Sequence, residues 1–221
     1  MTEPLPIVLI PGLLTSARLF SEQLTPLWRF GQVTIADRVL GLAPPRFALV
    51  GLSMGGYIAF EILRRAADRV ARLALLDTSA RPDTPELTER RRGQIALARS
   101  GGMDEVVEQQ LPLLLHPSRQ RDPELRRLVG LMAEETGAEA FAREQTAIIG
   151  RPDSRLDLGA IACPTLVLVG DADALTPPEH AAEIAAGIPG ARHVVVPDCG
   201  HLSTLERPSR VTRALVEWLE A

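Results

Sequence analysis

The chain has 221 residues, of which 46% are hydrophobic and 24% charged, and its formal net charge is −4. This length suits one globular α/β domain with room for an inserted subdomain, and the composition excludes disordered and fibrous classes. The chain contains no lysine, so all 24 residues counted as Lys or Arg are arginine. It also contains no asparagine. The one arginine run, Arg90 to Arg92, is predicted to be a solvated helix face, so we expect no nucleic-acid partner.

Short apolar runs alternate with longer helical patterns along the chain, which is typical of parallel strands covered by crossover helices. Strands are predicted at Pro6–Ile10, Val33–Ala36, Phe47–Gly51, Leu73–Leu76, Thr165–Gly170 and His193–Val196. Helices are predicted at Ala17–Trp28, Met54–Ala67, Pro177–Ile188, with a capping box from Thr176 to Glu179, and Pro208–Leu219. The predicted fold class is α/β, with a doubly wound, mostly parallel sheet of about six strands.

The alternation stops between Asp77 and Ala162, where four helical stretches follow one another without a strand. They are predicted at Pro85–Ser100, Met103–Leu115, Pro123–Glu135 and Ala138–Ile149. This predicts a core at 1–80 and 158–221 and an all-helical cap at 81–157, whose apolar surface roofs a pocket. The connector Asp37–Arg46 is short for a parallel crossover, so the sheet is expected to be thinly covered there and to be a candidate surface for a homo-oligomer.

The cysteines and the apolar runs predict where the protein is located. Cys163 and Cys199 form neither a disulfide framework nor a zinc spacing, which suits a reducing cytoplasm. The N-terminal apolar stretch is cut by Pro11-Gly12, unlike a signal peptide, and no run approaches the roughly 18 apolar residues that a membrane helix needs. We therefore expect a cytoplasmic protein with no membrane partner.

A serine motif lies at one strand-to-helix junction. Gly51-Leu52-Ser53-Met54-Gly55 has the form G-x-S-x-G, with a buried strand leading in and a helix leading out. This arrangement holds a serine hydroxyl exposed at the edge of a sheet, so Ser53 is predicted to be a nucleophile. The competing interpretation is a serine that only caps the helix.

A serine nucleophile needs a base and a carboxylate that orients the base. His201 lies just past the carboxyl end of a predicted strand, where sites in parallel sheets are built, and is the predicted base. His116, His180 and His193 are expected to be structural. Asp173, in the loop after Thr165–Gly170, is the predicted orienting carboxylate. The alternatives are Asp171, Asp77 and Asp198.

Backbone amides can stabilise the oxyanion that forms during attack on a carbonyl. The first free amide of the helix after Ser53 belongs to Met54. The loop after the first strand supplies a second, predicted to be the amide of Leu13, with Leu14 as the alternative. An ordinary strand-to-helix turn is the competing interpretation of this loop.

Three motifs in this order resemble the α/β-hydrolase superfamily: Gly-Leu-Ser53-Met-Gly-Gly, Gly170-x-x-Asp173-x-x-Thr-Pro-Pro and Gly200-His201-Leu. Within it the chain is similar to small bacterial esterase-like and lactonase-like enzymes with a helical cap. The resemblance implies a catalytic triad of Ser53, His201 and Asp173 with oxyanion donors at Leu13 and Met54, although Pro11 stands where the family has histidine.

The resemblance implies a serine hydrolase that cleaves a small, largely apolar ester or lactone through an acyl-enzyme, without a cofactor or metal. Substrate contacts are expected from Leu14, Tyr57, Leu114 and Met132. Acyl transfer, or perhydrolase or haloperoxidase activity on the same triad, is the alternative. A binding protein that keeps the fold without catalysis is the alternative from another class.

Overall fold

Six parallel strands form the centre of the computed structural model, which describes residues 5–27, 30, 33–35 and 43–221. Their order in the sheet is β2-β1-β3-β4-β5-β6, and every neighbouring pair is parallel. The strands are β1 (Ile7–Ile10), β2 (Val33–Ile35), β3 (Phe47–Leu52), β4 (Val70–Leu76), β5 (Thr165–Gly170) and β6 (Arg192–Val196).

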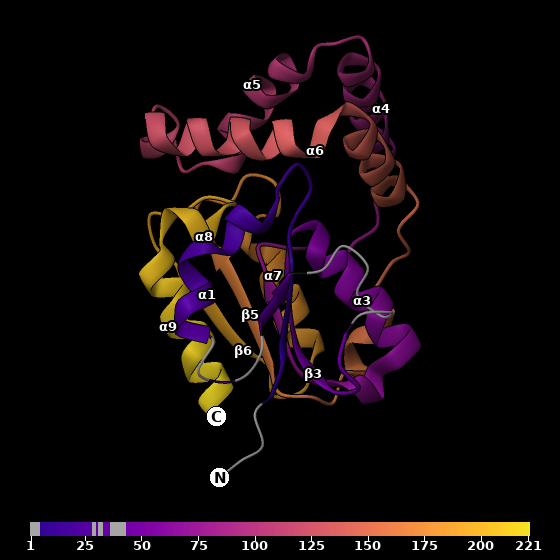
Figure 1. The fold of residues 1–221 in the computed structure, drawn as a ribbon. Helices are drawn as coiled ribbons and strands as arrows, with labels where there is room; N and C mark the ends of the chain where they lie inside the picture. Colours follow the sequence, from indigo (N-terminus) through magenta and orange to yellow (C-terminus); the bar gives the residue numbers. More distant parts are fainter. Residues whose placement is uncertain (1–4, 28–29, 31–32, 36–42) are drawn as a thin grey trace.

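Alternate side chains of each buried strand point to opposite faces of the sheet, so each face is apolar and is covered by helices. In β1, Ile7 and Leu9 belong to the core on the side of α1 (Ser21–Leu27) and α9 (Pro208–Glu220). Val8 and Ile10 belong to the core on the side of α3 (Met54–Ala66) and α7 (Pro178–Gly187). The predicted doubly wound α/β sheet is thus confirmed (Figure 1).

Between β4 and β5 the chain forms a cap of three helices above the edge where the strands end (Figure 1). They are α4 (Pro85–Arg99), α5 (Met103–Leu114) and α6 (Pro123–Ile149). The predicted pair Pro123–Glu135 and Ala138–Ile149 runs as one helix with a break, because Gly137 has φ 71° and is not helical. The inserted helical cap is confirmed, whereas the boundaries 81–157 stay a prediction.

Short helices complete the described chain. They are η1 (Ala17–Phe20), η3 (Ala67–Arg69), η4 (Pro117–Arg119), η5 (Arg155–Ala160) and α8 (Ser203–Glu206). The helix predicted at Ala17–Trp28 therefore begins as a 3₁₀ turn, and Trp28 lies outside the described residues. Most of the connector Asp37–Arg46 also lies outside them, so its predicted thin cover stays a prediction.

The capping box predicted at the start of α7 is wrong. Pro177 is the N-cap of this helix, and no side chain makes a capping hydrogen bond there. The Thr176 hydroxyl instead donates to Asp173 at 2.8 Å. A contact within the loop after β5 thus replaces the predicted cap, and it ties the start of α7 to the edge of the sheet.

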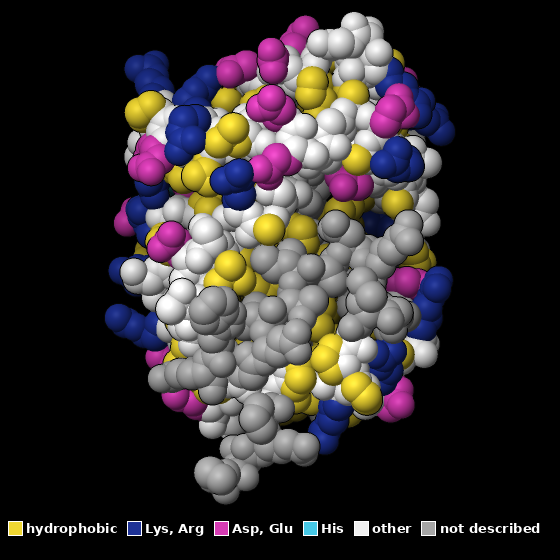
Figure 2. Space-filling view, viewed as in Figure 1, with side chains coloured by type: hydrophobic (Ala, Val, Ile, Leu, Met, Phe, Trp, Pro, Cys, Tyr) yellow, Lys and Arg dark blue, Asp and Glu magenta, His cyan; other side chains and the backbone are white. Residues whose placement is uncertain are grey.

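The surface carries charges of both signs. Figure 2 shows arginines and acidic residues interspersed over the cap and the core on the face in view. Within the part of the chain that the structure describes, no helix has the length and apolar character to cross a membrane.

Candidate active site

Ser53 occupies a sharp turn between β3 and α3. Its φ of 55° and ψ of −113° lie in a region that non-glycine residues rarely adopt. Flanking glycines make the turn possible, since a Cβ on Gly51 would lie 2.3 Å from the carbonyl oxygen of Gly55, and one on Gly55 would lie 2.2 Å from that of Ile10. The Ser53 side chain makes no capping hydrogen bond to α3, which leaves its hydroxyl available for other partners.

Asp173 and His201 form a buried pair at the ends of β5 and β6. His201 Nδ1 lies 2.8 Å from Asp173 Oδ2, and the two residues are 2% and 3% exposed. The other oxygen of Asp173, Oδ1, accepts the backbone N–H groups of Leu175 and Thr176, each at 2.9 Å. The carboxylate is therefore fixed, and its contact with the imidazole is made through Nδ1 and not through Nε2.

The loop that carries His201 is held by the cap and by α8. The N–H groups of His201 and Leu202 both donate to the carbonyl of Leu114, at 3.0 and 3.2 Å. One oxygen of Glu206 accepts the N–H of Gly200 at 2.8 Å, and the other accepts the N–H of His116 at 2.9 Å. The end of α5 therefore positions the predicted base directly.

Carboxylates around His201 change its affinity for a proton. Burial of the imidazole disfavours the charged form, but the carboxylate of Asp173, with smaller effects from Asp77 and Glu206, outweighs burial and raises the pKa of His201. Burial, followed by the charge of Asp173, raises the pKa of Asp77 well above its usual range. Asp77 accepts hydrogen bonds from the Ser203 hydroxyl and the Gly170 N–H.

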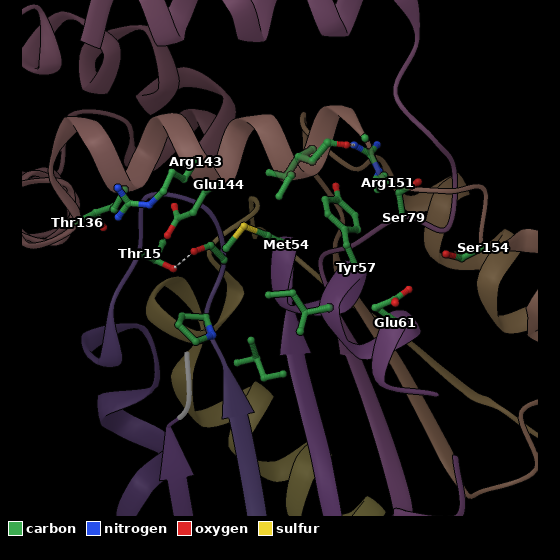
Figure 3. Close-up of a pocket in the computed structure, with 18 of the residues that line it drawn as sticks. Thr15, Met54, Tyr57, Glu61, Ser79, Thr136, Arg143, Glu144, Arg151 and Ser154 are labelled. Carbon is green, nitrogen blue, oxygen red and sulfur yellow. Dashed lines mark hydrogen bonds between the residues drawn. The ribbon is translucent and has the colours of Figure 1, made fainter. Parts of the chain in front are cut away.

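Ser53 and His201 line a common cavity of about 270 Å³ beneath the cap. Within the described residues the Ser53 hydroxyl has no hydrogen-bond partner, so it is not hydrogen-bonded to His201. Catalytic hydrogen bonds of this kind often form only when substrate binds. A wider cavity of about 970 Å³ between cap and core shares Tyr57, Ser79 and Arg151 with the first (Figure 3).

The two predicted oxyanion donors are unused. In the described part of the structure, neither the Leu13 amide nor the Met54 amide donates a hydrogen bond. The Leu14 amide, in contrast, points to Glu144 of α6 at 3.5 Å. This geometry favours Leu13 over Leu14 as the second donor.

The loop after β1 is held in place without the family's histidine, where the chain has Pro11. The Thr15 hydroxyl donates to the Gly12 carbonyl at 2.8 Å (Figure 3). Glu135 of α6 accepts the Ser16 hydroxyl at 2.6 Å and Arg18 Nε at 2.8 Å. The cap helix therefore fixes the loop that presents the Leu13 amide.

Three of the four predicted substrate contacts line the cavity with Ser53, namely Leu14, Tyr57 and Leu114. Met132 does not, because it is fully buried in the core of the cap. His180 was expected to be only structural, yet it lines the cavity and its Nδ1 has no partner among the described residues.

Sequence reasoning also missed the arginines of this cavity, which are Arg81, Arg90, Arg91 and Arg151. The prediction of a solvated face for the run Arg90 to Arg92 is wrong at Arg91, whose side chain is 12% exposed and pairs with Asp83. The only signal available in the sequence was the run itself, because three consecutive residues of a helix cannot all point to the same side.

The chain belongs to the alpha/beta hydrolase family, whose model matches residues 11–214. Among solved structures it is similar to a thermophilic esterase from Thermogutta terrifontis, with 36% identity and a TM-score of 0.89 over 98% of this chain and 89% of that one. It is also similar to the enol-lactonase from Burkholderia xenovorans LB400, with 28% identity and a TM-score of 0.90 over 99% and 92% of the two chains.

Curated relatives are similar over most of this chain. A pimeloyl-[acyl-carrier protein] methyl ester esterase from Chromobacterium violaceum is 29% identical over 87% of this chain and 77% of its own length. A putative carbamate hydrolase from Klebsiella pneumoniae is 31% identical over 77% of this chain and 64% of its own length.

Proposed function

We propose that this protein is a serine hydrolase that cleaves a carboxylic ester or a lactone of a small molecule. The observation that carries the proposal is the buried pair of His201 and Asp173, which lies at the wall of the cavity that Ser53 also lines. The names of the esterase and enol-lactonase relatives support ester and lactone substrates.

The mechanism begins when substrate in the cavity brings the Ser53 hydroxyl and His201 together. His201 Nε2 takes the proton of Ser53, whose Oγ attacks the carbonyl carbon, and the amides of Leu13 and Met54 hold the oxyanion. The proton then passes from His201 to the leaving alkoxide. Water, activated by His201, hydrolyses the acyl-enzyme and regenerates Ser53.

Asp173 performs two tasks in this sequence. Its hydrogen bond to Nδ1 keeps the imidazole in the tautomer that leaves Nε2 free to accept a proton, and its charge stabilises the imidazolium that forms. The three hydrogen bonds that it accepts from Leu175 and Thr176 keep it from rotating away. Apart from the substrate and water, the proposed reaction uses only groups of the protein, so it requires no cofactor or metal.

A fluorophosphonate probe tests this proposal, because it labels an activated serine covalently. The wild type is expected to take the label and to hydrolyse 4-nitrophenyl butyrate at pH 7 to 8, and Ser53→Ala is expected to do neither. Ser79→Ala is the matched control, since Ser79 lines the same cavity but stands outside the turn at Ser53. Absence of labelling and hydrolysis in the folded wild type would contradict the proposal.

A further inference from the structure

The cavity that Ser53 and His201 share has an unbalanced set of charges. Four arginines line it, at positions 81, 90, 91 and 151, and no aspartate or glutamate is among its described lining residues. An apolar acyl group would need none of these guanidinium groups. Any carboxylates that neutralise these arginines therefore lie outside the lining of the cavity.

Three of the four arginines have carboxylate partners behind the wall. Arg81 pairs with Glu183 of α7 at 2.8 Å. Arg91 and Arg151 share one carboxylate, that of Asp83, at 2.8 and 2.6 Å. Because one carboxylate faces two guanidinium groups, this cluster keeps one net positive charge beside the cavity.

Both arginines of this cluster also keep a free donor. Arg91 uses Nε for Asp83 and Nη1 for Gln145, and Arg151 uses Nε and Nη1 for Arg81, Asp83 and Ile148. The Nη2 group of each arginine has no acceptor within the described residues.

Arg90 adds a second uncompensated charge at the rim of the same cavity. Its side chain is exposed, lines the cavity and forms no ion pair or hydrogen bond with a residue that the structure describes. Partial burial, and to a smaller extent the neighbouring charge of Arg91, lower the pKa of Arg90, and the carboxylate of Asp83 opposes this shift. Arg92, one position further along α4, is 66% exposed and lies near Glu89 at 3.7 Å.

We propose that the substrate cleaved at Ser53 carries a carboxylate, which Arg90 binds together with Arg91 at the cap side of the cavity. This inference rests on the proposed hydrolase function and specifies its substrate class. A guanidinium group presents paired N–H donors that match the two oxygens of a carboxylate. A neutral substrate has no negative charge to pair with the arginines, so it gains nothing from them.

Matched pairs of esters test the inference. In 4-nitrophenyl hydrogen glutarate the acyl chain ends in a carboxylate, and in 4-nitrophenyl pentanoate it ends in a methyl group. In the second pair the charge lies on the alcohol part: 4-carboxyphenyl butyrate carries a carboxylate, and 4-carbamoylphenyl butyrate carries a neutral amide in its place. We expect kcat/KM of the wild type to favour the charged member of at least one pair by about ten-fold, the lower end of the range for one hydrogen bond to a charged group.

Arg90→Met removes the charge and keeps most of the length of the side chain. It should reduce the preference, by lowering kcat/KM for the charged ester several-fold more than kcat/KM for the neutral ester. Arg92→Met, the same change at the neighbouring position, should leave the preference intact, and 0.5 M salt should weaken it in the wild type.

Two results would overturn the inference. One is a wild type that hydrolyses the neutral esters through Ser53 without preferring either charged ester, which leaves the proposed hydrolase function standing. The other is an equal loss of preference in Arg90→Met and Arg92→Met. This would mean that the preference comes from the overall positive charge of the cap and not from a contact with Arg90. Absence of any Ser53-dependent hydrolysis would overturn the proposed function together with this inference.

Discussion

At the scale of single residues, the protonation of His201 controls the proposed reaction. Only the neutral imidazole can accept the proton of Ser53, and the charge of Asp173 holds its proton more tightly than in a free histidine, whose pKa is about 6.5. Protonation of His201 therefore removes activity as the pH falls. Because the pKa is raised, this loss begins at a higher pH than for an ordinary histidine.

The first prediction concerns this pH dependence. For 4-nitrophenyl butyrate, kcat/KM of the wild type should rise with pH with a midpoint above 6.5. Asp173→Asn should lower the midpoint, because the largest effect that raises the pKa is lost, and should lower kcat by about 10⁴-fold, as expected when the imidazole takes the wrong tautomer. Initial rates read at the isosbestic wavelength of nitrophenol measure both.

Asp77→Asn provides the comparison, because Asp77 binds Ser203 and Gly170 and not the imidazole. It should keep a kcat far above that of Asp173→Asn. If Asp77→Asn lost as much activity as Asp173→Asn, Asp77 and not Asp173 would orient the base.

The positions of the candidate residues could be predicted from the sequence where backbone geometry dictates them. The glycines around Ser53 and the position of His201 after a strand are local features, so motif and periodicity were sufficient. Met132 was misassigned because the rotation of a cap helix is set by packing against other helices. The pairing of Asp83 with Arg151 joins residues that are 68 positions apart, and no local pattern indicates it.

At the scale of elements, the close approach of α3 to β1 and β3 depends on glycines. Gly55 lies so near to the carbonyl of Ile10 that any side chain would collide with backbone. Gly130, in the middle of α6, has no atom within 4 Å of the place where a Cβ would stand. The same substitution should therefore have opposite effects in the two helices.

The second prediction compares these glycines. Gly55→Ala should destabilise the fold by about 1 to 3 kcal/mol or more, since backbone must move, and should reduce fluorophosphonate labelling of Ser53. Gly130→Ala should stabilise it by about 0.5 to 1 kcal/mol, because alanine is the better helix former. Urea unfolding followed by circular dichroism measures both. A stable, fully labelled Gly55→Ala would contradict the tight packing of α3.

The elements themselves were predictable to within a few residues, because strands and helices follow from apolar periodicity and from caps such as Thr84 and Asp122. Thr84 accepts the N–H of Leu87, and Asp122 those of Glu124 and Leu125. The capping box at Thr176 failed because its hydroxyl finds a better partner in the carboxylate of Asp173. A side-chain contact within the loop thus replaces the cap that the spacing predicts.

At the scale of the whole molecule, the cap is joined to the core by two chain segments that lie side by side. The Ser154 N–H donates to the Ala80 carbonyl at 2.8 Å, and Arg151 Nε donates to the Arg81 carbonyl at 3.0 Å. Asp83, whose side chain is 1% exposed, binds Arg91 and Arg151 and so links the segment that enters the cap to the one that leaves it. This cluster also forms part of the wall of the cavity that Ser53 lines.

The third prediction tests this link. Asp83→Asn keeps the size of the side chain but leaves two largely buried guanidinium groups without a carboxylate, so it should cost about 3 to 5 kcal/mol and lower Tm by about 10 °C. Asp153→Asn is the matched control, because Asp153 binds the more exposed Arg155 at the surface near the same segment, and it should move Tm by about one degree at most. Limited proteolysis locates the effect: in Asp83→Asn, cleavage should increase first in the two segments that join cap and core. If both variants lowered Tm equally, or if Asp83→Asn left Tm unchanged, the charge cluster would not be what holds the cap to the core.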